Sequence, residues 1–231
     1  MAYHFLRPIV QEELVVRIKT ADICISDLDY TDANSPAKNL AADFFHFWSK
    51  DYARWALSTA KRKISPLERQ RADSESWSEF IDSFLKKEEE LEYVKQRFSE
   101  AQVKKSLYPG VEEFYQSISG ALKVYLTRNI PEVADAYARE LGINVIIAEA
   151  FDKTEAIENY FLNNWNLKRW VVKGDSEEDA EVLDFLEYQK RRRKIDDVVG
   201  IYVCGDSYNS KFDINIPQDY RGLVEAMKRF G

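Results

Sequence analysis

The sequence predicts an α/β fold in which a parallel sheet, covered by helices, is interrupted by one long helical insertion. Short apolar runs of strand length recur, and from the second run onward they alternate with helical stretches. This alternation is typical of a parallel sheet with both faces covered. The segment between the first and second runs contains no strand-like run. We therefore expect a Rossmann-like core with an inserted all-helical domain.

Five runs are expected to form the strands of the core sheet. Each is short and rich in branched or aromatic apolar residues, as buried strands are. They are "DICIS" (22–26), "LKVYL" (122–126), "NVIIA" (144–148), "RWVV" (169–172) and "VGIYV" (199–203). The helices expected between the later strands are "PEVADAYARELG" (131–142), "TEAIENYFLNNW" (154–165) and "EEDAEVLDFLEYQKRRRK" (177–194). Residues 1–20 have a mixed pattern that assigns them to no element.

The insertion is expected to form a domain of its own. Residues 36–106 are rich in aromatic residues and have helical periodicity, with helix breaks expected at Pro66 and at "RADSES". The chain is expected to enter this segment at Ser35-Pro36 and to leave it at "SLYPGVEEF". The domains predicted are therefore a core of residues 1–35 and 107–231 and a helical domain of residues 36–106. A length of 231 residues suits one domain with an insert.

Composition narrows the classes of function. The net charge of -7 gives no support to nucleic-acid binding, and the basic run Lys190 to Lys194 is interpreted as a helix C-terminus. No C-x-x-C pair occurs and His4 and His46 are the only histidines, so neither a histidine cluster for zinc nor a His-based triad is expected. The N-terminus is too polar for a signal peptide, and no apolar run approaches transmembrane length. We expect a cytoplasmic protein that binds a small molecule rather than nucleic acid or a membrane.

Polar residues follow the expected strands at their carboxyl ends, where open parallel sheets bind ligands. The pair Asp27 and Asp29 comes first, and strand geometry sends both side chains toward the same face. Two like charges held close together are costly unless a cation compensates them, so a metal or a solvated turn are the alternatives. The residues that follow the strands are Asp27, Asp29 and Thr31, then Thr127 with Arg128 and Asn129, then Lys153, then Gly174, Asp175 and Asp179.

This ordered set resembles the motifs of the haloacid dehalogenase-like (HAD) superfamily of hydrolases. The sequence matches Asp27-x-Asp29-x-Thr31, Thr127, Lys153 and Gly174-Asp175-x(3)-Asp179 in the family's order, over residues from about 21 to 220. The helical insertion is similar to the family's cap. One such motif is weak evidence, whereas four in order, each at the end of an expected strand, are strong evidence.

The resemblance implies a Mg²⁺-dependent phosphatase that acts through an aspartyl-phosphate. Asp27 would be the nucleophile and Asp29 the general acid and base, while Thr127 and Lys153 would hold the phosphoryl oxygens. The carboxylates of Asp27 and Asp175 would bind Mg²⁺, together with the main-chain carbonyl of Asp29. Asp179, Arg128 and Asn129 are additional candidates. The expected substrate is a small-molecule phosphate ester.

Two motif residues have a rival candidate elsewhere in the sequence, and two positions depart from the family's usual residues. A second "GDS", Gly205-Asp206-Ser207, is less suited to the fourth motif because no uninterrupted helical pattern follows it. Lys173 is the rival lysine, although it stands at a strand end rather than at a helix start. Asp32 occupies a position that is usually apolar in the family, and Tyr30 one where glycine or a small residue is common.

Other functions are compatible with the same motifs. A phosphomutase or a phosphonatase would share them, whereas a dehalogenase is less expected because its site generally lacks the second acid that Asp29 provides. A catalytically silent domain is the alternative from another class, with the helical domain binding a protein partner. Its support is a set of aromatic residues that would more ordinarily form that domain's own core: Phe44, Phe45, Phe47, Trp48, Trp55 and Trp77.

Overall fold

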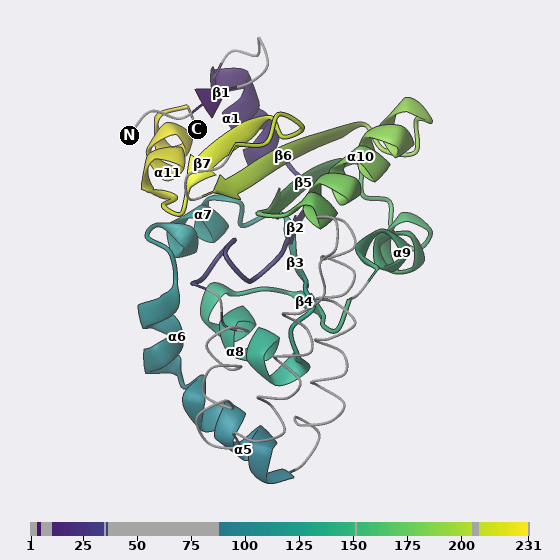
Figure 1. Cartoon of the computed structure of the whole chain (residues 1–231). Helices are drawn as coiled ribbons and strands as arrows, with labels where there is room; N and C mark the ends of the chain where they lie inside the picture. The colour runs from purple at the N-terminus through teal and green to yellow at the C-terminus, as the bar shows by residue number, and fades with distance from the viewer. Residues whose placement is uncertain are drawn as a thin grey trace, which may run out of the picture.

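The computed structural model describes residues 4–5, 11–34, 36, 88–150, 152–204 and 208–230. Over these residues the chain forms a seven-stranded sheet with the order β1-β7-β6-β5-β2-β3-β4 (Figure 1). All neighbouring strands run parallel except β1, which pairs antiparallel with β7 at one edge. The strands are β1 (His4–Phe5), β2 (Ile23–Ser26), β3 (Leu122–Leu126), β4 (Val145–Ile147), β5 (Arg169–Gly174), β6 (Asp197–Cys204) and β7 (Ile214–Pro217). The predicted α/β class and parallel sheet are confirmed.

Helices cover both faces of the sheet, as Figure 1 shows. One face packs on α1 (Gln11–Lys19), α7 (Val111–Ser117), α8 (Pro131–Leu141) and α11 (Arg221–Arg229). The other packs on α9 (Lys153–Ile157), the π-helix η1 (Glu158–Leu162) and α10 (Glu177–Arg191). Strand alternation divides the apolar side chains between these layers: Cys24 lies in the first core, and Ile23 and Ile25 lie in the second.

The strand order places β2 at the centre, with β3 on one side and β5 on the other. The chain moves outward from β2 through β3 to β4, then returns and builds β5, β6 and β7 on the opposite side. The order therefore reverses next to β2, and ligands bind open α/β sheets at such switch points. Ser26 is in register with Tyr125 of β3 and with Lys173 of β5. The segments that follow these three strands consequently leave the sheet side by side.

Local sequence signals account for the helix boundaries near this edge. Pro131 begins α8, where a missing N–H costs nothing, and Gly142 ends it in the left-handed conformation with φ of 65°. Ser176 caps α10 with its side chain while Asp179 bonds back to the Ser176 backbone, forming a capping box. The single helix expected over residues 154–165 is instead α9 followed by η1. Within η1, Phe161 is buried against Trp170, with ring centroids 6.5 Å apart.

Apart from its first residue, Pro36, the expected helical domain falls within the described residues only at its end, as α5 (Glu88–Arg97) and α6 (Glu100–Ser106). Both pack on α8, and the rings of Phe98 and Tyr137 lie 6.1 Å apart. Residues 37–87, which hold the expected helix breaks and the aromatic set, lie outside the described residues. The domain boundaries stay a prediction. No helix among the described residues is long and apolar enough to cross a membrane.

The chain passages to and from this segment lie next to each other. Ala33 forms an antiparallel bridge with Leu107, and the Asn34 N–H donates to the Ser106 carbonyl at 3.1 Å. The Tyr108 N–H donates to the Asp32 carbonyl at 2.9 Å. The chain that leaves β2 is therefore tied to the chain that returns toward α7.

Candidate active site

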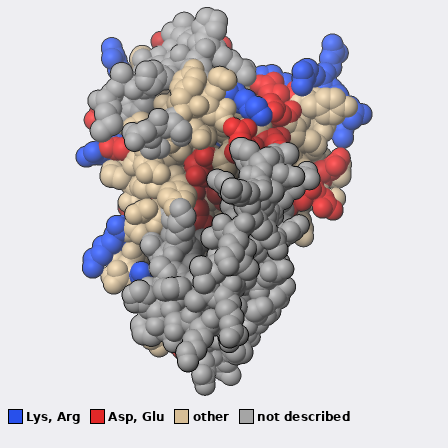
Figure 2. Space-filling model, viewed as in Figure 1, with Lys and Arg blue, Asp and Glu red and all other residues tan. Residues whose placement is uncertain are grey.

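Three carboxylates gather where β2 and β5 end. Single oxygens of Asp27, Asp175 and Asp179 all lie within 4.8 Å of one another. Asp27 follows β2 directly, Asp175 follows β5, and Asp179 lies in the first turn of α10. Figure 2 shows acidic side chains gathered near the middle of the face that Figure 1 views. The convergence follows from the parallel register of β2 and β5 at the switch point.

Lys153 is the cation that faces these acids. It is the first residue of α9 and is buried. Its Nζ lies 2.7 Å from Asp179 Oδ1 and 3.3 Å from Asp27 Oδ1. Burial alone would lower the pKa of Lys153, but the charges of Asp179 and Asp27 outweigh it and raise that pKa above its usual value. The ammonium therefore stays charged beside the proposed nucleophile.

Asp179 is fixed by the loop that it caps. Its Oδ2 accepts hydrogen bonds from the N–H groups of Asp175 at 3.1 Å and of Ser176 at 3.2 Å, and from the Ser176 hydroxyl at 2.7 Å. Gly174 makes this approach possible, because a Cβ there would meet Asp179 Cγ at 2.1 Å. With its other oxygen on Lys153, Asp179 joins the loop after β5 to the start of α9.

Asp29 lies on the other side of the site, toward β3. Its Oδ2 accepts a short hydrogen bond from Asn129 Nδ2. The Asn129 backbone N–H donates in turn to Thr127 Oγ1 at 3.2 Å, and both Thr127 and Asn129 are buried. The side chain of Asp29 is thus separate from the group of three carboxylates, while Thr31 Oγ1 lies 3.4 Å from Asp175 Oδ1. The structure brings Asp27, Lys153, Asp175 and Asp179 together, and it joins Asp29 to the Thr127 segment through Asn129.

Crowding raises the pKa of two of the acids. Burial, reinforced by the charges of Asp179 and Asp27, raises the pKa of Asp175 to about 8. Burial also raises the pKa of Asp27, although Lys153 opposes the shift. Shifted acids of this kind cluster at functional sites, and a divalent cation would relieve the repulsion. The donor set is composed of carboxylate oxygens, which are the ligands that Mg²⁺ prefers, so these residues fit that ion.

Comparisons with protein-family models and with curated proteins found no match. Solved structures do match. Cytosolic 5′-nucleotidase IIIB bound to cytidine has a TM-score of 0.61 at 14% identity, over 95% of this chain and 89% of that chain. A substrate-bound phosphoserine phosphatase has a TM-score of 0.54 at 13% identity, over 90% of this chain and 98% of that chain. A phospho-aspartyl intermediate analogue of phosphoserine phosphatase has a TM-score of 0.55 at 16% identity, over 90% of this chain and 99% of that chain.

The chain has a haloacid dehalogenase-like fold, which it shares with these solved structures. The resemblance drawn from its motifs is confirmed at the level of the fold, which is what identities this low establish. In this HAD-like fold the four matched motifs stand after β2, β3, β4 and β5, at the carboxyl edge of the sheet. The role of each site residue stays a prediction.

Lys173, the alternative to Lys153 as the motif lysine, lies in a different environment. Lys173 is buried, and its Nζ lies 2.6 Å from Asp32 Oδ1 rather than beside the three carboxylates. Asp32, which the sequence marked as a departure, therefore has a buried partner that the sequence analysis missed. The available signal was a pair of charged residues, one in the loop after β2 and one inside the apolar run of β5. Gly205, Asp206 and Ser207 lie outside the described residues.

Two further features border the site. Tyr30 has a φ of 55°, in the left-handed region that favours glycine. Arg128 and Glu178 form an ion pair of 3.2 Å at its partly exposed side. Arg128 follows β3 between the other two candidates, Thr127 and Asn129, and its partner Glu178 lies in the first turn of α10, next to Asp179.

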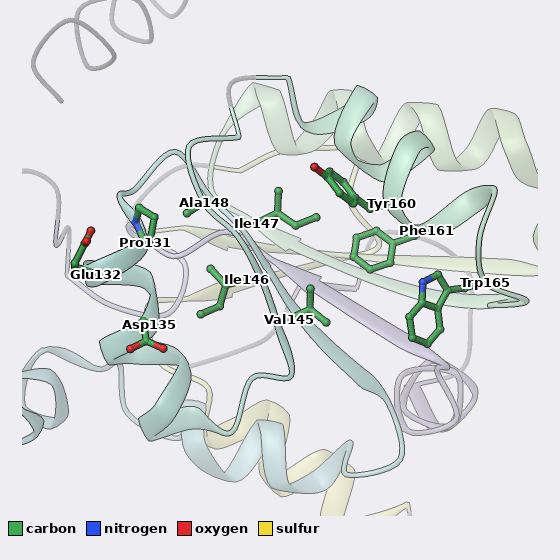
Figure 3. Close-up of a pocket in the computed structure, with 10 residues that line it drawn as sticks. All are labelled: Pro131, Glu132, Asp135, Val145, Ile146, Ile147, Ala148, Tyr160, Phe161 and Trp165. Atoms are coloured by element: carbon green, nitrogen blue, oxygen red, sulfur yellow. The ribbon is translucent and has the colours of Figure 1, made fainter. Parts of the chain in front are cut away.

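A hollow of about 800 Å³ lies beside the edge strand β4 (Figure 3). Side chains from α8 border it on one side and those from η1 and the following turn on the other. No motif residue lines it. Its lining residues are Pro131, Glu132, Asp135, Val145, Ile146, Ile147, Ala148, Tyr160, Phe161 and Trp165.

Proposed function

We propose that this chain is a Mg²⁺-dependent phosphatase that hydrolyses a small-molecule phosphate monoester through an aspartyl-phosphate. The observation on which this proposal rests is the position of Lys153, buried between Asp27 and Asp179 beside the carboxylate of Asp175. The names of the similar structures, a 5′-nucleotidase and phosphoserine phosphatases, support phosphate-ester chemistry. The phospho-aspartyl analogue among them supports the proposed intermediate.

Asp27 and Asp175 would bind Mg²⁺ through their carboxylates, and Asp29 through its main-chain carbonyl. When bound, the ion supplies positive charge that lets an anionic nucleophile approach an anionic phosphate. Lys153 supplies a fixed charge for the same purpose, since its Nζ lies 3.3 Å from Asp27 Oδ1. Asp179 holds this lysine and the loop of Asp175 in place.

The reaction proceeds in two displacements. A carboxylate oxygen of Asp27 forms a bond to phosphorus while the bond from phosphorus to the ester oxygen breaks, and protonated Asp29 gives its proton to the leaving alkoxide. Asp29 then takes a proton from water, whose oxygen bonds to phosphorus as the bond to Asp27 breaks. Inorganic phosphate leaves and both acids return to their starting states. Thr127 and Lys153 bind the phosphoryl oxygens during transfer.

A catalytically silent domain is less well supported. Burial and the neighbouring carboxylates raise the pKa of Asp175, and acids shifted in this way cluster at functional sites. The aromatic residues that would support a protein-binding cap lie outside the described residues. Phosphomutase and phosphonatase activities stay alternatives, because the same core residues could serve phosphoryl transfer between hydroxyls or cleavage of a carbon–phosphorus bond.

The test compares hydrolysis of p-nitrophenyl phosphate with Mg²⁺ and with EDTA. Wild-type protein should require Mg²⁺, and Asp27→Asn should lose at least a thousandfold in rate while its circular dichroism stays unchanged. Asp196→Asn is the matched control, because Asp196 is exposed and precedes β6 at the opposite end of the sheet. Mass spectrometry after acid quench should find the phosphate on Asp27. A Mg²⁺-independent rate, or an active Asp27→Asn protein, would contradict the proposal.

A further inference from the structure

Asp32 and Lys173 form an ion pair in the interior, beneath the two loops that hold the acids. Lys173 Nζ lies 2.6 Å from Asp32 Oδ1, and both side chains have 0% exposure. Asp32 is the neighbour of Thr31 in the loop after β2. Lys173 immediately precedes Gly174-Asp175 at the end of β5. Each partner is thus one or two residues from a motif of the proposed active site.

Hydroxyl groups complete the bonding of the Asp32 carboxylate. Tyr115 and Tyr125 donate to Oδ2 at 2.6 and 3.1 Å, and the Tyr220 hydroxyl shares its one proton between Oδ1 at 3.1 Å and the Thr31 carbonyl at 2.9 Å. The Ser26 hydroxyl also lies 3.2 Å from Oδ2. Burial and the charge of Asp32 raise the pKa of each tyrosine well above its usual value, so these hydroxyls stay protonated. With Lys173 included, groups from five elements converge on this carboxylate: β2, β3, β5, α7 and the start of α11.

The ammonium of Lys173 has an equally complete environment. It donates to Asp32, lies 3.3 Å from the Tyr220 hydroxyl, and faces the rings of Phe114, Tyr115 and Tyr220 at 4.7, 4.3 and 4.7 Å from their centroids. Such cation–π contacts are strongest where water is excluded. The charge is therefore accommodated entirely by protein groups.

Stability alone is a poor reason for such a pair. Buried ion pairs are often matched or exceeded in stability by apolar residues of similar volume, because taking two charges out of water is costly. Their best-attested use is to specify one arrangement among several. The arrangement specified here is the relation between the loop after β2 and the end of β5.

We propose that the Asp32–Lys173 pair is a positioning unit that sets the distance between the nucleophile loop and the loop of Asp175. The backbone around it already ties these loops: the Asp27 N–H donates to the Lys173 carbonyl at 3.2 Å, and the Asp32 N–H closes its own loop on the Leu28 carbonyl at 3.1 Å. The main-chain carbonyl of Asp32 also accepts a hydrogen bond from the Tyr108 N–H. This inference rests on the proposed phosphatase function and assigns to it two positioning residues that do not touch the substrate.

The experiment compares wild-type protein with Asp32→Asn, Lys173→Met and the double variant Asp32→Leu/Lys173→Met. Calorimetry measures Mg²⁺ affinity without substrate, and steady-state kinetics measure kcat and KM. The double variant leaves no buried charge unpaired but removes the acceptor of the Tyr115 and Tyr125 hydroxyls, so its melting temperature should fall less than that of either single variant. Its Mg²⁺ affinity should fall at least fivefold and its kcat at least tenfold, with KM changed less than threefold. A folded double variant with wild-type Mg²⁺ affinity and kcat would overturn the inference.

Two controls separate positioning from loss of stability. Asp197→Asn breaks the Arg17–Asp197 pair at the opposite end of the sheet, so it should lower the melting temperature while leaving Mg²⁺ affinity and kcat unchanged. If the double variant fails to fold, Tyr220→Phe replaces it, because this change removes one hydroxyl from the unit at nearly constant volume. It should lower Mg²⁺ affinity and kcat at least twofold, and wild-type values would overturn the inference. An inactive wild type that binds no Mg²⁺ would instead overturn the proposed function, and this inference with it.

Discussion

The ammonium of Lys153 lies 3.3 Å from the carboxylate of Asp27, and both side chains are at most 13% exposed. Lys153 also lies 2.7 Å from Asp179, so one cation neutralises two acids that burial would otherwise disfavour. The geometry explains why a lysine at the first position of α9 can act on a residue at the end of β2. Its Nζ reaches from the β4–α9 connection to the central strand end.

Replacing Lys153 by methionine should reduce kcat about a hundredfold or more, because a preorganised charge aimed at the reacting group is typically worth that much. The side-chain volume is nearly kept, so the loss reports the charge. Stopped assays with p-nitrophenyl phosphate at saturating Mg²⁺ provide the measurement. Lys228→Met, on the exposed side of α11, is the matched control and should keep the wild-type rate. If the kcat of Lys153→Met stayed within threefold of the wild-type value, Lys153 would have no catalytic role.

The two "GDS" segments should differ sharply in their effect on Mg²⁺ activation. Asp175→Ala removes a carboxylate from the group it forms with Asp27 and Asp179, so the Mg²⁺ concentration for half-maximal rate should rise about tenfold or more. Asp206→Ala should change it less than threefold. Parallel Mg²⁺ titrations of both variants decide between the segments. The reverse ranking would assign the fourth motif to Asp206.

Much of the core could be predicted because it depends on local pattern. The alternation of apolar runs with helices determines the parallel sheet, and the convergence of strand ends brings Asp27 and Asp175 together without knowledge of any contact. The capping box and Gly142 are likewise local signals. Lys153 was expected at a helix start, and it is the first residue of α9.

The contacts between distant residues could not be predicted in the same way. The pairing of Asp32 with Lys173 depends on the register of β2 against β5, which no short pattern encodes. The contact between Asn129 and Asp29 depends on the turn after β3. Residues 1–20, which the sequence assigned to no element, contain the edge strand β1, only two residues long and too short for periodicity to show, and the nine-residue helix α1.

The Arg17–Asp197 pair should make the fold sensitive to acid. Arg17 donates to Asp197 Oδ2 and Oδ1 at 2.5 and 2.7 Å, and Lys190 donates to Oδ1 at 2.7 Å. Burial would raise the pKa of Asp197, but these hydrogen bonds outweigh it and lower that pKa. Because the pKa of Asp197 is lower in the folded state than in the unfolded state, its charge stabilises the fold at pH values above the unfolded-state pKa. This stability is lost as the pH falls through the folded-state pKa.

Asp197→Asn should therefore lower the free energy of unfolding by about 2 kcal/mol at pH 7, the usual loss for hydrogen bonds to a charged group. The difference from wild type should shrink as the pH falls below about 4, the usual pKa of an aspartate. Urea denaturation at several pH values measures it. The exposed neighbour Asp196→Asn should stay within about 0.5 kcal/mol of wild type throughout. A difference that does not depend on pH would show that packing, rather than charge, is responsible.

Asn129 should matter most for substrates with poor leaving groups. Its Nδ2 donates to Asp29, and its Oδ1 is buried with no hydrogen-bond partner among the described residues, so the amide is held mainly by its contacts with Asp29 and Thr127. Alanine at this position would leave the proposed general acid without its orienting donor. Proton donation accelerates departure of an alkoxide far more than departure of a nitrophenolate, which is stable as an anion.

We therefore expect Asn129→Ala to lower kcat about tenfold or more for an alkyl phosphate, within the usual contribution of general acid catalysis. For p-nitrophenyl phosphate the same change should cost less than threefold. Asn166→Ala, in the exposed turn before β5, is the matched control and should leave both rates unchanged. The informative quantity is the ratio of the two losses. Equal losses on both esters would show that Asn129 supports the whole site rather than the proton on Asp29, because a general defect would not distinguish one leaving group from another.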